Sequence, residues 1–157
     1  MTVTAQEIWD ALHDVADPEI PTINVVDLGI IRRVDLGEPI RVEMMPTFVG
    51  CPALDLMRRD IRERLREFGE VEVKVVFDEP WTTERITPAG RAMLSAASLA
   101  PPPRGGIRLT PVPAEPVACP YCGSTETQLE NLFGPTACRS IHYCRSCRQP
   151  FEAFKVV

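Results

Sequence analysis

Four cysteines in two close pairs constrain this chain more than any other feature. The pairs are CPYC at 119–122 and CRSC at 144–147, separated by 21 residues. Each CxxC turn directs two sulfur atoms at one point, and two such turns supply the tetrahedral thiolate shell that zinc prefers. We therefore predict a zinc ribbon with four structural ligands: Cys119, Cys122, Cys144 and Cys147. Iron or an iron–sulfur cluster at the same four cysteines is the alternative.

The ribbon, at residues 117–157, is predicted to be the second of two modules. About 40 residues are too few for a good apolar core, so metal should supply much of the folding free energy. Residues 99–116 hold six prolines and two adjacent glycines, which is typical of a semi-extended linker. Residues 1–98 are long enough for a small folded domain. Within the ribbon, Cys138 is expected as a buried hydrophobe and His142 as a strand residue, although either could exchange into the metal site.

Hydrophobic periodicity predicts an α+β fold for residues 1–98. Thr4 should cap a helix that runs to about Val15, and residues 30–36 and 40–45 should form a hairpin. A helix with an apolar stripe along one side is then expected over 52–68. A strand should follow over 71–77, and a short helix from Thr87–Pro88 to about residue 97. In this α-β-β-α-β order a right-handed crossover makes the second and third strands parallel, so we expect a small mixed sheet.

Cys51 lies apart from the other cysteines, in the turn PTFVGCPALD. Because Pro52 suits the first position of a helix, Cys51 is expected at the N-cap, where the helix dipole stabilises a thiolate. The topology should bring this turn close to Asp27 and to the segment DEPWTTER. The carboxylate of Asp27 would raise the pKa of the thiol, which opposes activation. The alternative is a small buried cysteine that fills a corner.

Charge and composition exclude several classes of protein. The net charge is −6 over residues 1–116 and +1 over residues 117–157, so neither part has the basic surface that nucleic acid requires. We find no signal-like start and no apolar stretch near the roughly 20 residues of a membrane span. We therefore expect a cytoplasmic protein with no membrane partner, whose cysteines are metal ligands, reactive thiols or core residues rather than disulfides.

Five segments carry a resemblance to a known family. DPEIPTINVVDLGII, PTFVGCPA and PWTTERITPAGR resemble the small iron–sulfur assembly domain related to SufT, and CPYCGSTET together with FGPTACRSIHYCRSCRQPFEAFK resembles the ribbon of its PaaD branch. The resemblance implies a non-catalytic accessory protein of bacterial phenylacetate degradation. Its implied role is to assist assembly or insertion of iron or iron–sulfur centres in the phenylacetyl-CoA epoxidase system. The implied partners are the oxygenase or reductase of that system or iron–sulfur carrier proteins, and a homodimer is left open.

The resemblance also implies roles for particular residues. Cys51 matches the family's characteristic cysteine and Cys138 its TAC element, so both are implied to handle iron or a transient cluster. The other matched positions are implied to line the site around Cys51: Asp17, Glu19, Asp27, Thr47, Gly50, Trp81, Thr82 and Thr83. A structural adaptor of the epoxidase is the second interpretation. A thiol enzyme is the weakest, because neither His13 nor His142 is placed to act as a base for Cys51.

Overall fold

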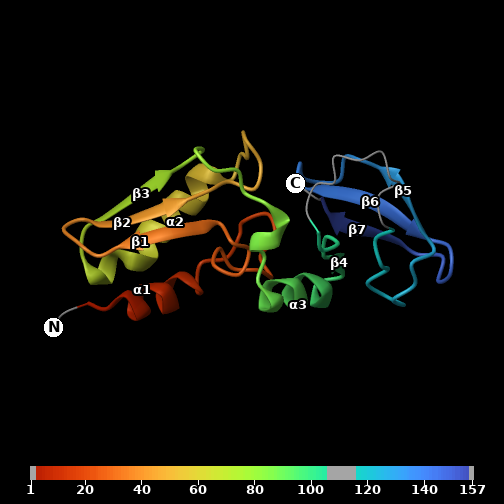
Figure 1. The fold of residues 1–157 in the computed structure, drawn as a ribbon, viewed down its shortest axis with the longest axis horizontal. Helices are drawn as coiled ribbons and strands as arrows, with labels where there is room; N and C mark the ends of the chain where they lie inside the picture. Colours follow the sequence, from red (N-terminus) through yellow and green to blue (C-terminus); the bar gives the residue numbers. More distant parts are fainter. Residues whose placement is uncertain (1–2, 106–115, 156–157) are drawn as a thin grey trace. The chain divides into compact units, whose positions relative to one another are not determined.

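The computed structural model describes residues 3–105 and 116–155 (Figure 1). Among these residues the chain forms two compact units. The first contains the residues up to Trp81 together with Arg85–Gly90, and the second contains Thr82–Glu84 and the residues from Arg91 on. Most of the proposed linker, residues 106–115, lies outside the described residues, so its boundaries remain a prediction. In the described part, no helix is both long and apolar enough to cross a membrane.

The first unit begins with helix α1, Ala5–Leu12, which starts where the capping signal predicts. The amide of Glu7 donates to Thr4 Oγ1 at 3.3 Å, and the amide of Thr4 donates to Glu7 Oε2 at 2.8 Å. This reciprocal pair satisfies two amides that the first helical turn leaves without partners. The helix ends three residues earlier than predicted, but Val15 is still buried, as the apolar stripe requires.

The sheet of the first unit is mixed, as predicted. Strands β1 (Ile31–Asp35) and β2 (Ile40–Met44) form an antiparallel hairpin, with a register shift between Ile31 and Arg33. Strand β3 (Val71–Val75) pairs with β2 in parallel over five consecutive residues, so the strand order is β1-β2-β3. The predicted crossover and its parallel strands are therefore confirmed.

Helix α2, Leu54–Leu65, makes the crossover between β2 and β3 and continues into a short 3-10 helix, Arg66–Phe68. Its buried residues, Met57, Ile61 and Leu65, recur every four positions and form one stripe. The sheet contributes further buried side chains, among them Val42 and Val73. The stripe predicted from sequence thus forms the core side of α2, and most of its arginines lie on the partly or fully exposed side.

A short 3-10 helix, Thr83–Arg85, and helix α3, Pro88–Ala96, follow β3 along the chain. The second unit then forms a sheet in the order β4-β7-β6-β5. Its strands are β4 (Leu99–Ala100), β5 (Thr127–Asn131), β6 (Arg139–Cys144) and β7 (Pro150–Phe154). A small cluster of buried residues forms its core: Ala100, Cys119, Cys144, Phe151 and Ala153. This confirms an α+β chain with a mixed-sheet domain followed by a ribbon.

Strand β4 was not expected, since it lies in the segment that its composition placed in the linker. Leu99 pairs with Glu152 and Ala100 with Ala153, both in parallel register with β7. Both residues of β4 are buried. The ribbon sheet therefore includes residues that precede the proline-rich segment.

Candidate functional site

The loop around Asp27 and the segment that follows β3 lie against each other, as predicted. The indole Nε1 of Trp81 donates to the carbonyl of Leu28 at 3.1 Å, and Nε of Arg85 donates to the carbonyl of Gly29 at 2.9 Å. The amide of Thr87 donates to the carbonyl of Asp27, also at 2.9 Å. Three donors from one segment thus hold three consecutive carbonyls of the other.

Gly29 allows this close approach. Its φ is +74°, and a Cβ atom at this position would lie 2.5 Å from the carbonyl oxygen of Arg85. We expect Gly29→Ala to lower the free energy of unfolding of the first unit by about 2–4 kcal/mol, because backbone strain and a backbone clash add. Urea denaturation followed by tryptophan fluorescence measures this change.

Gly50→Ala is the matched control for that prediction. Gly50 also has a positive φ, +87°, but a Cβ atom added there would meet no atom within 4 Å. Only the conformational cost of about 1–2 kcal/mol should then remain. If the two substitutions lowered the free energy of unfolding equally, the close approach of Gly29 to the backbone of Arg85 would not explain the effect at Gly29.

Two of the predicted site-lining carboxylates hold the loops in place. Asp27 Oδ2 accepts from Asn24 Nδ2 at 2.7 Å, and Asp27 Oδ1 accepts from Thr87 Oγ1 at 2.5 Å. Asp17 Oδ1 accepts from the amides of Glu19 and Ile20, at 2.8 and 2.9 Å. Both aspartates are buried. Their observed contacts hold the backbone and side chains of their own loops, and their role in lining a site around Cys51 remains a prediction.

The other predicted site-lining residues differ in exposure. Trp81 and Thr83 are buried, Glu19, Thr47 and Thr82 are half-buried, and Gly50 is exposed. Among the described residues, the buried Thr83 Oγ1 has no hydrogen-bond partner. The structure therefore places Asp27 and Trp81 at the same loop, and the site role of all these residues stays a prediction.

The prediction that Cys51 is the N-cap of α2 is wrong. The N-cap is Ala53, which makes no side-chain capping bond. Cys51 instead lies in a turn, where its amide donates to the carbonyl of Phe48 at 3.1 Å and its carbonyl accepts from the amide of Leu54 at 3.3 Å. Pro52 suits this turn as well as a first helical turn, which explains the error. Because the dipole effect falls off within one turn, it stabilises a thiolate less at this position.

The Cys51 loop, residues 45–53 between β2 and α2, exposes apolar side chains that were not predicted from the sequence. Phe48 is 46% exposed and Val49 is 77% exposed, while Cys51 itself is half-buried. Phe77, 61% exposed, follows β3. Since β2 and β3 are parallel, the segments that carry these residues leave the sheet at the same end (Figure 1). An apolar TFV run between turn residues was the sequence signal for this surface.

The four cysteines of the ribbon form a metal-binding cluster. Their sulfur atoms all lie within 4.8 Å of one another. Cys119 Sγ and Cys147 Sγ are 3.7 Å apart, and Cys122 Sγ and Cys144 Sγ are 3.6 Å apart. A tetrahedron with metal–sulfur bonds of about 2.3 Å has edges of about 3.8 Å. The observed separations therefore fit a zinc ion bound by four thiolates.

Both CxxC turns are fixed by backbone hydrogen bonds. In the first, the amide of Gly123 donates to the carbonyl of Cys119 at 2.8 Å, and in the second, the amide of Cys144 donates to the carbonyl of Gln149 at 2.9 Å. The residue after each second cysteine has a left-handed backbone: φ is +72° at Gly123 and +60° at Arg148. The two turns share this geometry although only one of them has glycine at the position.

Arg148 is therefore a strained residue in the second turn. We expect Arg148→Gly to stabilise the metal-bound ribbon by about 0.5–1 kcal/mol, because glycine adopts a positive φ without steric cost. Thermal unfolding of the zinc-bound protein measures the gain. Arg148→Ala, which removes the same side chain but keeps the strain, should give no such gain, and an equal gain in both variants would contradict the backbone explanation.

Two cysteines of the cluster differ in acidity. A hydrogen bond from the backbone of Cys147 lowers the pKa of the Cys144 thiol to about 7. Burial raises the pKa of the Cys147 thiol to about 12. Because metal binding requires thiolates, the affinity of this cluster for a metal ion should fall as the pH is lowered.

Cys138 and His142 lie outside the four-sulfur cluster that the described residues form. The sulfur of Cys138 lies 3.1 Å from Thr136 Oγ1, and the residue is half-buried rather than fully buried as predicted. His142 lies in β6, as predicted, with Nε2 3.0 Å from Ser140 Oγ and its ring stacked on Phe151. Burial lowers the pKa of His142, so the imidazole is neutral at pH 7.

Comparison with known proteins identifies the family. A protein of Escherichia coli K12, named as a subunit of the "Putative 1,2-phenylacetyl-CoA epoxidase", is 40% identical over 154 residues, which cover 96% of this chain and 92% of that protein. The profile of the PaaD zinc beta ribbon domain matches residues 107–155. The chain belongs to the PaaD family. A profile described as an iron–sulfur cluster assembly protein matches residues 5–76.

Three further relatives match between about half and three fifths of this chain. The Bacillus subtilis protein named Fe-S protein maturation auxiliary factor YitW is 31% identical over 52% of the chain and 84% of its own length. A crystal structure of a DUF59 domain from Bacillus anthracis has a TM-score of 0.53 and 28% identity, and covers 57% of this chain and 89% of its own. A Thermotoga maritima protein, TM0487, has a TM-score of 0.51 and 31% identity over 59% of this chain and 96% of its own. This chain thus carries an iron–sulfur cluster assembly profile at residues 5–76 and a ribbon profile at residues 107–155.

Proposed function

We propose that this PaaD chain is a non-catalytic accessory protein that assists assembly or insertion of iron or iron–sulfur centres in the phenylacetyl-CoA epoxidase system. The observation that carries the proposal is the Cys51 loop. It presents a half-buried thiol beside exposed Phe48 and Val49, on a domain that matches an iron–sulfur cluster assembly profile. A thiol next to an apolar contact surface suits transfer of a metal centre to a docked partner, because contact and ligand exchange occur at one place.

In this proposal the metal of the ribbon has a structural role. The donor set is four cysteines, and their sulfur separations of 3.6 and 3.7 Å suit zinc. Four protein ligands would fill the coordination shell and leave no position for a substrate. Cys119, Cys122, Cys144 and Cys147 would hold the ion, which supplies folding free energy rather than reactivity.

Cys51 is the proposed working ligand. Its thiolate would bind iron or a cluster transiently, and the partner's own cysteines would then replace it. Cys138, half-buried and outside the zinc cluster, is proposed as a further thiol for this handling. Asp17, Asp27 and Trp81 are proposed to support the site by holding their own loops in place. The remaining matched positions, Glu19, Thr47, Gly50, Thr82 and Thr83, are proposed to line the site.

The proposed partners are the oxygenase or reductase of the epoxidase, or iron–sulfur carrier proteins, in the cytoplasm. The proposed organisation is an assembly domain at 1–98, a linker at 99–116 and a ribbon at 117–157. Pairing of Leu99 and Ala100 with β7 argues for a linker that starts a few residues later.

A structural adaptor of the epoxidase is the second candidate. The exposed apolar side chains of Phe48, Val49 and Phe77 favour it, since such a surface docks a partner with or without metal transfer. In that case Cys51 would only pack in its turn.

Metal analysis of the epoxidase separates the two functions. The complex should be purified anaerobically from cells that contain or lack this chain, and the iron and sulfide of each component measured. An assembly factor predicts components that are present but deficient in metal when the chain is missing. Fully metallated components that no longer associate would instead establish the adaptor.

A further inference from the structure

Among the residues that the structure describes, strand β3 pairs with another strand on one side only. It is an edge strand, because the first sheet has the order β1-β2-β3. Val76 donates to the carbonyl of Met44, and Glu70 accepts from the amide of Ile40, so residues 70 and 76 face β2. Since backbone direction alternates along a strand, the amides and carbonyls of Val71, Val73 and Val75 face away from the sheet. The edge therefore offers three regularly spaced donors and acceptors.

The other edge of the same sheet is less suited to pairing. Strand β1 has a register shift between Ile31 and Arg33, which marks an irregular edge. In contrast, β3 keeps an unbroken register with β2 from Val71 to Val75. Bulges are a common way to prevent pairing at an edge, and β3 has none over these five residues.

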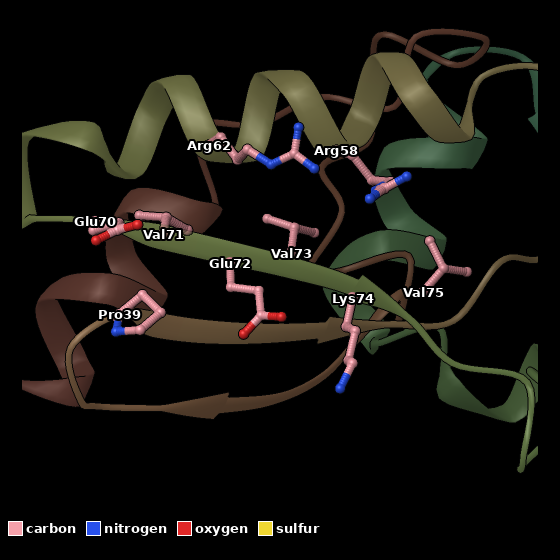
Figure 2. Close-up of a pocket in the computed structure, with 9 residues that line it drawn as sticks. All are labelled: Pro39, Arg58, Arg62, Glu70, Val71, Glu72, Val73, Lys74 and Val75. Carbon is pink, nitrogen blue, oxygen red and sulfur yellow. The ribbon is translucent and has the colours of Figure 1, made fainter.

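A groove of about 560 Å³ runs along this edge, between β3 and helix α2. Figure 2 shows Arg58 and Arg62 projecting from α2 over the strand, with the three valines on the same side and Glu72 and Lys74 on the opposite side. The groove thus has an apolar floor and a basic wall. Two acidic residues also line the groove: Glu70, at the end where the strand begins, and Glu72, on the side of the strand opposite the arginines.

The two arginines of the wall have unused hydrogen-bonding capacity. Arg58 makes one long bond, 3.3 Å, to the exposed Asp55, and its buried Nε has no partner among the described residues. Arg62 is exposed, and the ion pairs found in the described part of the chain do not include it. Neighbouring Arg59, in contrast, binds Asp60 at 3.0 Å. Carboxylates form strong, charge-assisted hydrogen bonds with guanidinium groups whose N–H donors are still available.

We propose that the β3 edge docks an extended acidic segment of a partner protein, which joins the sheet as a fourth strand and places carboxylates against Arg58 and Arg62. Backbone pairing with Val71, Val73 and Val75 supplies affinity, and the arginines select acidic side chains at alternate positions. A second copy of this chain fits less well. Helix α2 lies over β3, so pairing of two β3 strands about 4.8 Å apart would bring two helices closer than the 8–10 Å at which helices pack.

The test uses the full-length, zinc-bound chain and a fluorescein-labelled peptide, acetyl-TVEVEVT-amide, at low ionic strength. Fluorescence anisotropy should show saturable binding. The peptide TVKVKVT should bind at least about tenfold more weakly, since its charges oppose the arginines. A TVEVEVT peptide methylated on alternate backbone nitrogens should also lose affinity, because a methylated nitrogen cannot donate a backbone hydrogen bond to β3.

Arg62→Glu and Arg59→Glu form the matched pair of variants, as both positions lie on α2 but only Arg62 lines the groove. Arg62→Glu should weaken TVEVEVT binding about tenfold, and Arg59→Glu should leave it within about twofold. Failure of TVEVEVT to bind, or equal effects of the two substitutions, would overturn the proposal. Sedimentation that shows a dimer sensitive to Arg62→Glu would also overturn it, in favour of a second copy.

Discussion

Replacing Cys119 with serine is expected to release the metal and unfold the ribbon. Cys119 is buried, lies 3.7 Å from Cys147 Sγ, and belongs to the small core around Phe151. Structural zinc supplies about 10–16 kcal/mol of binding free energy in small zinc modules, more than a core of this size can replace. Zinc should fall from about one per chain to nearly none, and β6 and β7 should lose their protection from hydrogen exchange.

The first unit supplies an internal reference for this experiment. Its sheet is separate from that of the ribbon, so amides of β2 and β3 should stay protected in the same sample. Cys138→Ser is the matched control, since it makes the same chemical change in the ribbon but outside the sulfur cluster. A Cys119→Ser protein that keeps its metal, or wild-type protein that contains mainly iron after aerobic purification, would contradict the structural zinc site.

Replacing Cys51 with serine should abolish function without affecting the fold. The side chain is half-buried in a surface turn, and serine is nearly isosteric, so zinc content and thermal stability should match those of wild type. Serine is a poor ligand for iron, because its hydroxyl is not ionised at neutral pH. In cells that lack the native protein, we expect this variant to restore less than about a tenth of the epoxidase metallation that wild type restores.

Val49→Ser separates docking from ligation at the same loop. It removes an apolar side chain that is 77% exposed and leaves the thiol in place. A client that docks there should be metallated more slowly but completely, because the ligand remains. If Cys51→Ser restores a fully metallated, active epoxidase, the assembly proposal loses its central residue and the adaptor proposal gains support.

Local signals in the sequence were sufficient for much of the fold. The capping box at Thr4, the apolar stripe of α2 and the CxxC pairs each act over a few residues, and the structure contains all three. The right-handed crossover rule then gave the parallel pairing of β2 and β3. These features follow from short-range chemistry and chain connectivity, so a single sequence contains them.

The features that were missed depend on partners distant in the chain. Strand β4 has two residues, and only its pairing with β7, some 50 positions later, makes it a strand. The close approach of Gly29 to the backbone of Arg85 likewise joins residues that are far apart in the sequence. The N-cap error had a different cause, since Pro52 satisfies both a turn and a helix start and the local sequence cannot distinguish them. The free edge of β3 could be recognised only once the strand order was known.

The positive φ of Gly50 allows a D-amino acid to be placed next to Cys51 by chemical synthesis. A D-alanine prefers the φ of +87° found there, and its methyl group would meet no atom within 4 Å. Peptide 1–50, made as a thioester ending in D-alanine, can be joined to a recombinant chain that begins at Cys51, because an N-terminal cysteine is the residue that native chemical ligation requires. The product would retain the thiol but have a stiffer backbone, so rigidity and reactivity of the loop can be varied independently.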